Sequence, residues 1–144
     1  MTGSVDGTPG RRRMSVQRIL LVEDDDDISE LFADALREEG YDVDVAGTVE
    51  AAWAHLDAHG YGLAIVDWKL PDGDGTSIAD AAAQLGAKTF LMSGYLPQMP
   101  GGRAEGHANI MKPIMSDELV RAVRLALGGP VLFDAALNSS GSET

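Results

Sequence analysis

Short apolar runs alternate with amphipathic stretches along the chain from Arg18 onward. Apolar runs bounded by turn residues predict strands, whereas apolar positions spaced by three and four residues predict helices. On this basis five short strands are expected, at residues 19–22, 41–46, 63–66, 89–92 and 109–111. Strands that alternate with helices are typical of the α/β class, in which crossover helices connect the strands of a parallel sheet.

Four helical stretches separate or follow these strands. In the first, one apolar stripe is predicted to face inward, formed by Ile28, Leu31, Phe32, Ala35 and Leu36, and the helix is expected to end at Gly40. The second is expected to begin after Thr48 as N-cap, with Trp53 in the core, and the third to cover residues 76–85. The fourth is expected to begin with Ser116 as N-cap and to stop at Gly128.

Three segments do not follow this pattern. Residues 1–16 contain Gly, Ser, Thr and three consecutive arginines without apolar periodicity, which predicts a disordered leader before a folded domain at 17–128. Prolines and glycines are frequent in residues 97–106, so the fourth crossover helix is expected to be short, displaced or absent. Residues 129–144 contain an apolar patch and are expected to form either a docking or dimer-forming helix or a partly ordered tail.

Composition narrows the classes of function. The 144 residues include 11 Lys and Arg against 23 Asp and Glu, a net charge of −12 that repels phosphate backbones and disfavours nucleic acid as a partner. The absence of cysteine excludes disulfides, thiolate zinc sites and a cysteine nucleophile. With no long apolar run and no secretory signal, the protein is expected to be soluble and cytoplasmic, without a membrane partner.

Polar residues follow the predicted strands, and these are the candidate chemical groups: Glu23, Asp24, Asp67, Ser93 and Lys112. The carboxyl ends of parallel strands form the binding edge of an α/β sheet, so these groups are expected to meet there. Carboxylates about 4 Å apart repel each other by about 4 kcal/mol at an effective dielectric constant of 20. The cluster therefore predicts a hard divalent cation, with Mg²⁺ the best fit, and a carboxylate in such a site can accept a phosphoryl group as an acyl phosphate.

Five short motifs then give a resemblance to a family. The motifs are Ile-Leu-Leu-Val-Glu-Asp at 19–24, Leu-Ala-Ile-Val-Asp at 63–67, Leu-Pro-Asp-Gly at 70–73, Met-Ser-Gly at 92–94 and Lys-Pro at 112–113. In this order they resemble the receiver domains of bacterial two-component response regulators, over residues 17 to about 128. Together with Tyr95, the Met-Ser-Gly motif looks like that of receivers attached to hybrid histidine kinases or of single-domain receivers.

The resemblance implies a flavodoxin-like, doubly wound sheet of five parallel strands in the order 2-1-3-4-5. It implies that Asp67 is the phosphoacceptor, that Asp24 is a direct ligand of Mg²⁺ and that Glu23 acts on the ion through water. The backbone carbonyl of Lys69 would complete the protein's share of the coordination. We therefore expect a Mg²⁺-dependent phosphoacceptor and not an enzyme beyond self-catalysed phosphorylation and dephosphorylation.

Two further roles and the partners follow from the same resemblance. Ser93 resembles the hydroxyl that bonds the phosphoryl group, and Lys112 the cation that pairs with it, next to a Lys-Pro bond that is cis in the family. The expected phosphodonor is a sensor histidine kinase or a histidine phosphotransfer protein, and the downstream partner is an unknown protein. The residues after 128 are expected to be too few for a DNA-binding output domain, so the domain is expected to act by protein contact, to serve as a phosphate relay or sink, or to be cut from a larger kinase. A monomer or weak dimer is expected.

Some features depart from the family or allow another interpretation. Asn109 occupies the position where receivers often carry an aromatic switch residue, so a change of order in the 94–108 loop is expected to transmit the signal instead. Asp72 and Asp74 in Asp-Gly-Asp-Gly-Thr resemble the motif of haloacid-dehalogenase-like phosphatases, although no strand directly precedes Asp72. A third alternative is a non-phosphorylated interaction module. Asp25, Asp26 and Asp27 are interpreted as stabilising a helix N-terminus and not as ligands.

Overall fold

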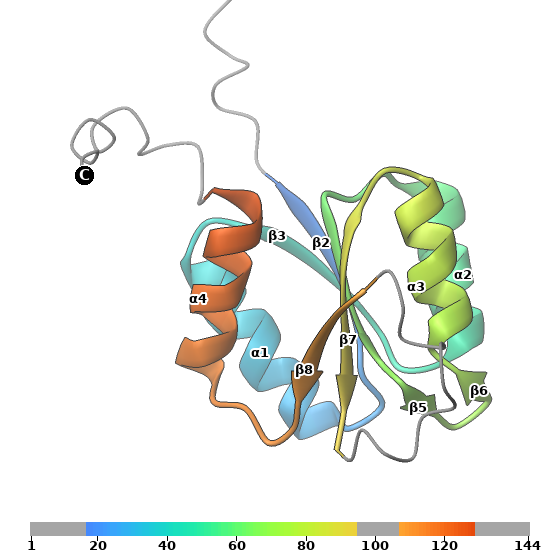
Figure 1. Ribbon diagram of the computed structural model, residues 1–144, viewed down its shortest axis with the longest axis horizontal. Helices are drawn as coiled ribbons and strands as arrows, with labels where there is room; N and C mark the ends of the chain where they lie inside the picture. The colour runs from blue at the N-terminus through green and yellow to red at the C-terminus, as the bar shows by residue number, and fades with distance from the viewer. Residues whose placement is uncertain (1–16, 95–106, 129–144) are drawn as a thin grey trace, which may run out of the picture.

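The five predicted strands form one parallel sheet in a computed structural model that describes residues 17–94 and 107–128 (Figure 1). Along the sheet the order is β3-β2-β4-β7-β8. The strands are β2 (Arg18–Val22), β3 (Asp42–Ala46), β4 (Leu63–Asp67), β7 (Lys88–Ser93) and β8 (Ala108–Met111). In chain order this is 2-1-3-4-5, so the predicted fold and strand order are confirmed, and every strand end lies within one residue of its predicted place.

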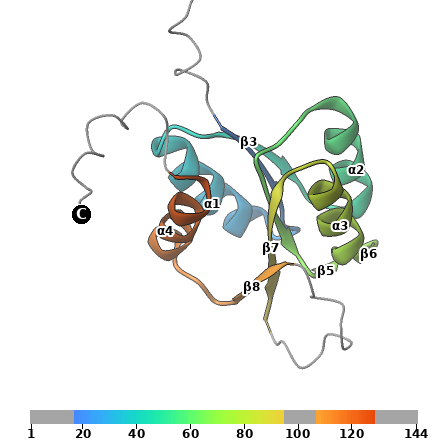
Figure 2. The ribbon, with the colours of Figure 1, turned by 45° about the horizontal axis from the view of Figure 1, so that its top comes forward.

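Two helices cover each face of the sheet (Figures 1 and 2). Helices α1 (Asp26–Glu38) and α4 (Ser116–Leu127) lie on one face, and α2 (Val49–Ala58) and α3 (Thr76–Gln84) on the other. Side chains of β2 alternate between the faces, so that Ile19 and Leu21 join the cluster under α1 and α4, whereas Leu20 and Val22 join the cluster under α2 and α3. Burial on both faces explains why the central strands are continuous apolar runs.

Side chains cap the N-termini of α1 and α2 near the places the sequence predicted. Asp25 Oδ1 accepts a hydrogen bond from the Ile28 N–H at 3.1 Å, and Thr48 Oγ1 accepts one from the Ala51 N–H at 3.0 Å, which confirms Thr48 as an N-cap. The prediction for Ser116 is wrong, because Ser116 is already the first residue of α4 and Met115 is the N-cap. There Glu118 Oε1 accepts a hydrogen bond from the Met115 N–H at 3.0 Å.

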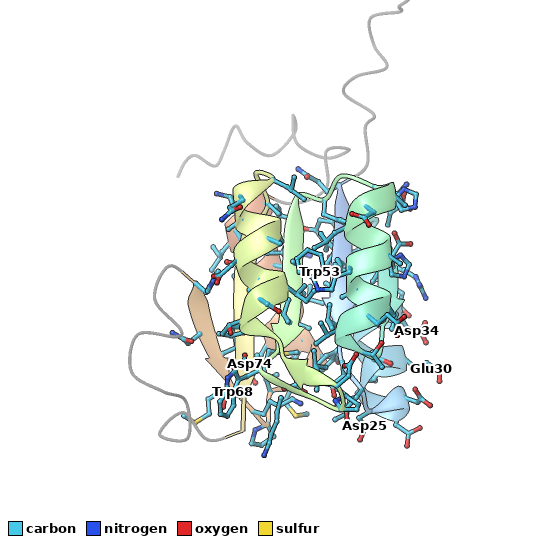
Figure 3. The ribbon with its side chains drawn as sticks, turned by 90° about the vertical axis from the view of Figure 1, so that its right-hand side faces the viewer. Asp25, Glu30, Asp34, Trp53, Trp68 and Asp74 are labelled. Atoms are coloured by element: carbon cyan, nitrogen blue, oxygen red, sulfur yellow. The ribbon has the colours of Figure 1, made fainter. Side chains whose placement is uncertain are left out.

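Two residues predicted to be inside are exposed. Leu31 is 56% exposed and Trp53 is 41% exposed, and Figure 3 shows Trp53 between α2 and α3. Phe32 and Leu36, which belong to the same apolar stripe of α1 as Leu31, are buried. A helix that packs on a sheet and one neighbouring helix buries a narrower stripe than its apolar periodicity covers, so residues at the border of the stripe stay at the surface.

A small hairpin directly after β4 was not predicted. Strands β5 (Lys69–Leu70) and β6 (Gly73–Asp74) pair antiparallel, and Gly75 then leads into α3. A Cβ on Gly75 would lie 2.1 Å from the backbone oxygen of Asp67 and 2.7 Å from Val66 Cγ1. Only glycine permits this approach, so the start of α3 is packed directly against the end of β4.

The predicted leader, the disrupted crossover helix and the tail lie outside the described residues, which leave out 1–16, 95–106 and 129–144. Most of the 94–108 loop, for which a change of order is expected, lies outside them as well. Within residues 17–94 and 107–128, no helix has the length and apolar character that crossing a lipid bilayer requires.

Candidate functional site

The candidate groups gather at the carboxyl edge of the sheet, as the strand pattern predicted. Glu23 and Asp24 follow β2, Asp67 is the last residue of β4, Ser93 is the last residue of β7, and Lys112 follows β8. Figure 3 shows Asp25, Trp68 and Asp74 at this same end of the molecule. Parallel pairing of neighbouring strands brings these residues together although they are far apart in the sequence.

Three carboxylates form an acidic cluster, defined by Glu23, Asp24 and Asp67. One oxygen atom from each lies within 4.8 Å of the others. Glu23 is 1% exposed and Asp67 is 6% exposed, whereas Asp24 is exposed. Two of the acidic groups are therefore fixed by the fold, and the third lies at the opening of the site to solvent.

Lys112 enters the acidic cluster from the edge strand. Its Nζ lies 2.9 Å from Asp67 Oδ2, to which it donates a hydrogen bond, and 2.9 Å from Glu23 Oε1. The Lys112–Pro113 peptide bond is cis, as the resemblance implies. Lys112 is thus a shared counterion for the two buried carboxylates.

The electrostatics of the site show an excess of negative charge. Burial raises the pKa of Glu23 above its usual value, and this effect outweighs the contact with Lys112 and the hydrogen bond from the Asp25 N–H. Burial alone would lower the pKa of Lys112, but its contacts with the carboxylates of Glu23 and Asp67 raise it above the usual value of a lysine. The ammonium group therefore stays charged at neutral pH and balances only part of the acidic cluster.

The donor set fits a hard divalent cation. Three ionised carboxylates and one ammonium group leave two negative charges in excess, and carboxylate oxygens are the ligands that such cations prefer. Glu23 Oε1 is buried and, among the described residues, has the ion pair with Lys112 but no aligned hydrogen bond. A buried carboxylate oxygen with spare accepting capacity beside two other carboxylates can be satisfied by an ion or by a water molecule bound to one.

The other predicted site residues lie at the same edge. Ser93 is 2% exposed, and its backbone oxygen accepts a hydrogen bond from the Lys112 N–H at 2.9 Å. Lys69 lies in β5 with an exposed side chain, two residues after Asp67. The functions expected of the Ser93 hydroxyl and the Lys69 carbonyl remain predictions.

Asp72 and Asp74 have contacts that hold the β5–β6 hairpin in place. Asp72 lies in the turn between the two strands, where its carboxylate accepts hydrogen bonds from the Val49 N–H at 2.7 Å and the Glu50 N–H at 3.1 Å. These bonds, with that from Val49 the stronger, lower the pKa of Asp72. Asp74 Oδ1 accepts hydrogen bonds from the N–H and the hydroxyl of Thr76. This placement does not match a nucleophile that directly follows a buried strand.

The contacts of two further residues, Gly75 and His107, could not be predicted from the sequence. Position 75 requires glycine because the backbone there lies close to the backbone of Asp67. No local sequence pattern predicts this contact. His107 lies directly before β8, and its ring is hydrogen-bonded to residues of α3 and β7. Its partners are 27 and 18 residues away, so only the folded chain identifies the contact.

Comparison with known proteins identifies the family. Residues 19–124 match the family model of the response regulator receiver domain. The chain belongs to this family. The receiver domain is 40% identical over 131 residues to the transcriptional regulatory protein TcrA of Mycobacterium tuberculosis, an alignment that covers 85% of this chain and 52% of TcrA. The chain thus spans about half the length of this curated relative.

Solved structures agree with this assignment. A CheY-like receiver domain protein from Methanospirillum hungatei is 32% identical with a TM-score of 0.71, over 79% of this chain and 95% of that one. The response regulator TrrA of Thermotoga maritima, solved in complex with Mg²⁺-BeF, is 30% identical with a TM-score of 0.69, over 78% of this chain and 100% of that one. The five-stranded fold is therefore that of receiver domains.

Proposed function

We propose that this receiver domain accepts a phosphoryl group on Asp67 from a histidine kinase or a histidine phosphotransfer protein and passes the signal on by protein contact. The proposal depends on one observation: the side chain of Asp67 lies close to those of Glu23, Asp24 and Lys112 at the carboxyl edge of the sheet. A carboxylate alone at a strand end would be a turn residue, whereas this one is buried, paired with a lysine and placed beside two further acids.

In the proposed step, a carboxylate oxygen of Asp67 attacks the phosphorus atom of a phosphohistidine. An O–P bond forms, the P–N bond breaks, and the imidazole of the donor leaves with the electron pair and takes up a proton from solvent. Lys112 contacts Asp67 Oδ2 at 2.9 Å and is placed to neutralise negative charge that develops on the phosphoryl oxygens. Ser93, at the end of the adjacent strand, is the proposed hydroxyl contact.

A divalent cation is part of this proposal. Asp24, Asp67 and the Lys69 backbone carbonyl would hold Mg²⁺ directly, and Glu23 would act through water. When bound, the ion supplies positive charge that offsets the acidic cluster and the incoming phosphoryl group. The presence of Mg²⁺-BeF in the complex of the related TrrA supports this choice of ion.

The proposal is tested by incubating the protein with Mg²⁺ and a small acyl phosphate donor and measuring its intact mass. We expect a gain of one phosphoryl group that is lost with Asp67→Asn or with a chelator. Asp72→Asn is the matched control, because it makes the same change in an exposed acid outside the acidic cluster. Its mass gain should equal that of the wild type.

The same variants, assayed for phosphate-ester turnover as well as for mass gain, separate the two alternatives. Turnover of a phosphate ester that is lost only with Asp72→Asn would support a phosphatase and contradict the proposal. No mass gain in the wild type under donor and Mg²⁺ would support an interaction module that is not phosphorylated.

A further inference from the structure

His107 is a buried titratable residue outside the acidic cluster, at the start of the edge strand. Its side chain is 2% exposed, and both ring nitrogens are bonded. Nδ1 lies 2.6 Å from Thr89 Oγ1 of β7, and Nε2 lies 2.7 Å from Asp80 Oδ1 of α3. One imidazole thus connects three elements: the edge strand, its neighbour in the sheet and a helix on one face.

The chemistry of these contacts fixes their direction. A carboxylate oxygen can only accept, so Nε2–H donates to Asp80. In the neutral ring Nδ1 then accepts from the Thr89 hydroxyl, and every polar atom of the buried ring has a partner. A fully satisfied buried polar group of this kind favours one arrangement of the surrounding segments over its alternatives.

Within the described part of the chain, the side chains of β8 itself do little to fix its register against β7. Three of its four residues are exposed, and only Ile110 is half-buried against the core. Backbone hydrogen bonds between β8 and β7 can form in any register. A slip of β8 by one or two residues along β7 would be enough to move its side chains out of place. A slip of two residues would leave Ile110 on the same face and move the strand by about 6.6 Å, whereas a slip of one residue would move it by about 3.3 Å and reverse its faces.

Thr89 and His107 stand directly before the first pair of the observed register, Phe90 with Ala108. Their side chains therefore face each other only in this register. A slip in either direction would separate the hydroxyl from the imidazole and leave a buried ring with unpaired nitrogens, at the cost of its desolvation.

The register of β8 decides where Lys112 lies. The strand ends at Met111, opposite Ser93, and the next residue is Lys112, whose Nζ is 2.9 Å from Glu23 and Asp67. A misplacement of about 1 Å in a catalytic group can cost about a hundredfold in rate, and each slip considered above is larger. We infer that His107 is a positioning residue, whose bonds to Thr89 and Asp80 set the register of β8 and so place Lys112 for phosphoryl transfer. This inference rests on the proposed function.

A double-mutant cycle tests the inference. The rate of mass gain with Mg²⁺ and an acyl phosphate donor is measured for wild type, His107→Leu, Lys112→Met and the double variant. We expect His107→Leu to lower the rate by about 10- to 100-fold. In the background of Lys112→Met the same change should have little further effect, because the lysine that His107 positions is gone.

Conservative variants and a control complete the test. His107→Gln can accept from Thr89 and donate to Asp80, so it should recover most of the rate, and Thr89→Val should lower the rate as His107→Leu does. His59→Leu is the matched control, since His59 is exposed at the end of α2. The inference is overturned by a wild-type rate in His107→Leu and Thr89→Val, or by losses that multiply in the double variant, as a general structural defect would produce.

A second readout does not depend on phosphorylation. Nuclear Overhauser effects between β7 and β8 report the pairing of Leu91 with Asn109 directly. Loss or weakening of these contacts in His107→Leu supports the inference, and an unchanged register overturns it. A wild-type protein that gains no mass would overturn the proposed function instead, so the two failures can be told apart.

Discussion

Lys112→Met should destabilise the folded protein when no divalent cation is present. Methionine has a similar length, but it removes the charge shared by Glu23 and Asp67. Oxygen atoms of the acidic cluster lie within 4.8 Å of one another, and two unit charges at this distance repel by about 3.5 kcal/mol at an effective dielectric constant of 20. Solvent screens part of this repulsion, because the Lys112 side chain is 22% exposed. We expect the free energy of unfolding at pH 7 to fall by about 1–3 kcal/mol.

Urea denaturation with a chelator, repeated with Mg²⁺, measures this loss. Mg²⁺ should narrow the difference between variant and wild type, because the ion offsets the same excess of negative charge. Lys88→Met is the control, since Lys88 is exposed at the start of β7 and its removal should change the free energy of unfolding by less than about 0.5 kcal/mol.

The pH dependence of the loss provides a second check. The pKa of Glu23 is raised in the folded state. The stability that this carboxyl group contributes is therefore present below pH 4.5, its usual pKa, and is lost as the pH rises through its pKa in the folded protein. Without Lys112 this pKa should rise further. The destabilisation should therefore be largest at neutral pH and shrink as the pH falls toward about 4.5. A variant as stable as wild type in chelator, or a loss independent of both pH and Mg²⁺, would refute this account of the site.

Three other changes have outcomes that denaturation can measure. Tyr61→Phe removes a 2.7 Å hydrogen bond to Asp44, whose pKa is lowered because bonds from Tyr61 and Arg18 outweigh its burial. It should cost about 1–2 kcal/mol at pH 7, and less as the pH falls below the usual value of 3.8. Gly75→Ala should lower the free energy of unfolding by about 1–3 kcal/mol, because its Cβ would collide with the end of β4. Gly60→Ala is the control, since no atom lies within 4 Å of the added Cβ, and it should not lower the free energy of unfolding in this way. Arg124→Ala removes a surface ion pair with Glu39 and should cost less than about 1 kcal/mol.

The parts of the fold that could be predicted from the sequence are those with local signals. Strands β2 and β4 are buried on both faces, so they appear as apolar runs, and the acids that follow them are found at once. The hairpin of β5 and β6 has two residues in each strand, which is too short for any periodicity. Leu31 and Trp53 were placed wrongly because periodicity defines an apolar stripe but does not show how much of it a neighbouring element covers.

The site itself combines strongly and weakly specified parts. Glu23 follows β2 and Asp67 ends β4, and both strands are buried in the centre of the sheet, so the hydrophobic core fixes the positions of these two acids. Lys112 follows an edge strand with little buried surface, whose place depends on a hydrogen-bonded side chain. Substitutions in the core should therefore lower the stability of the whole domain. Substitutions at the His107 contacts should lower the phosphorylation rate strongly but change the free energy of unfolding only slightly, because few apolar contacts are lost when β8 shifts.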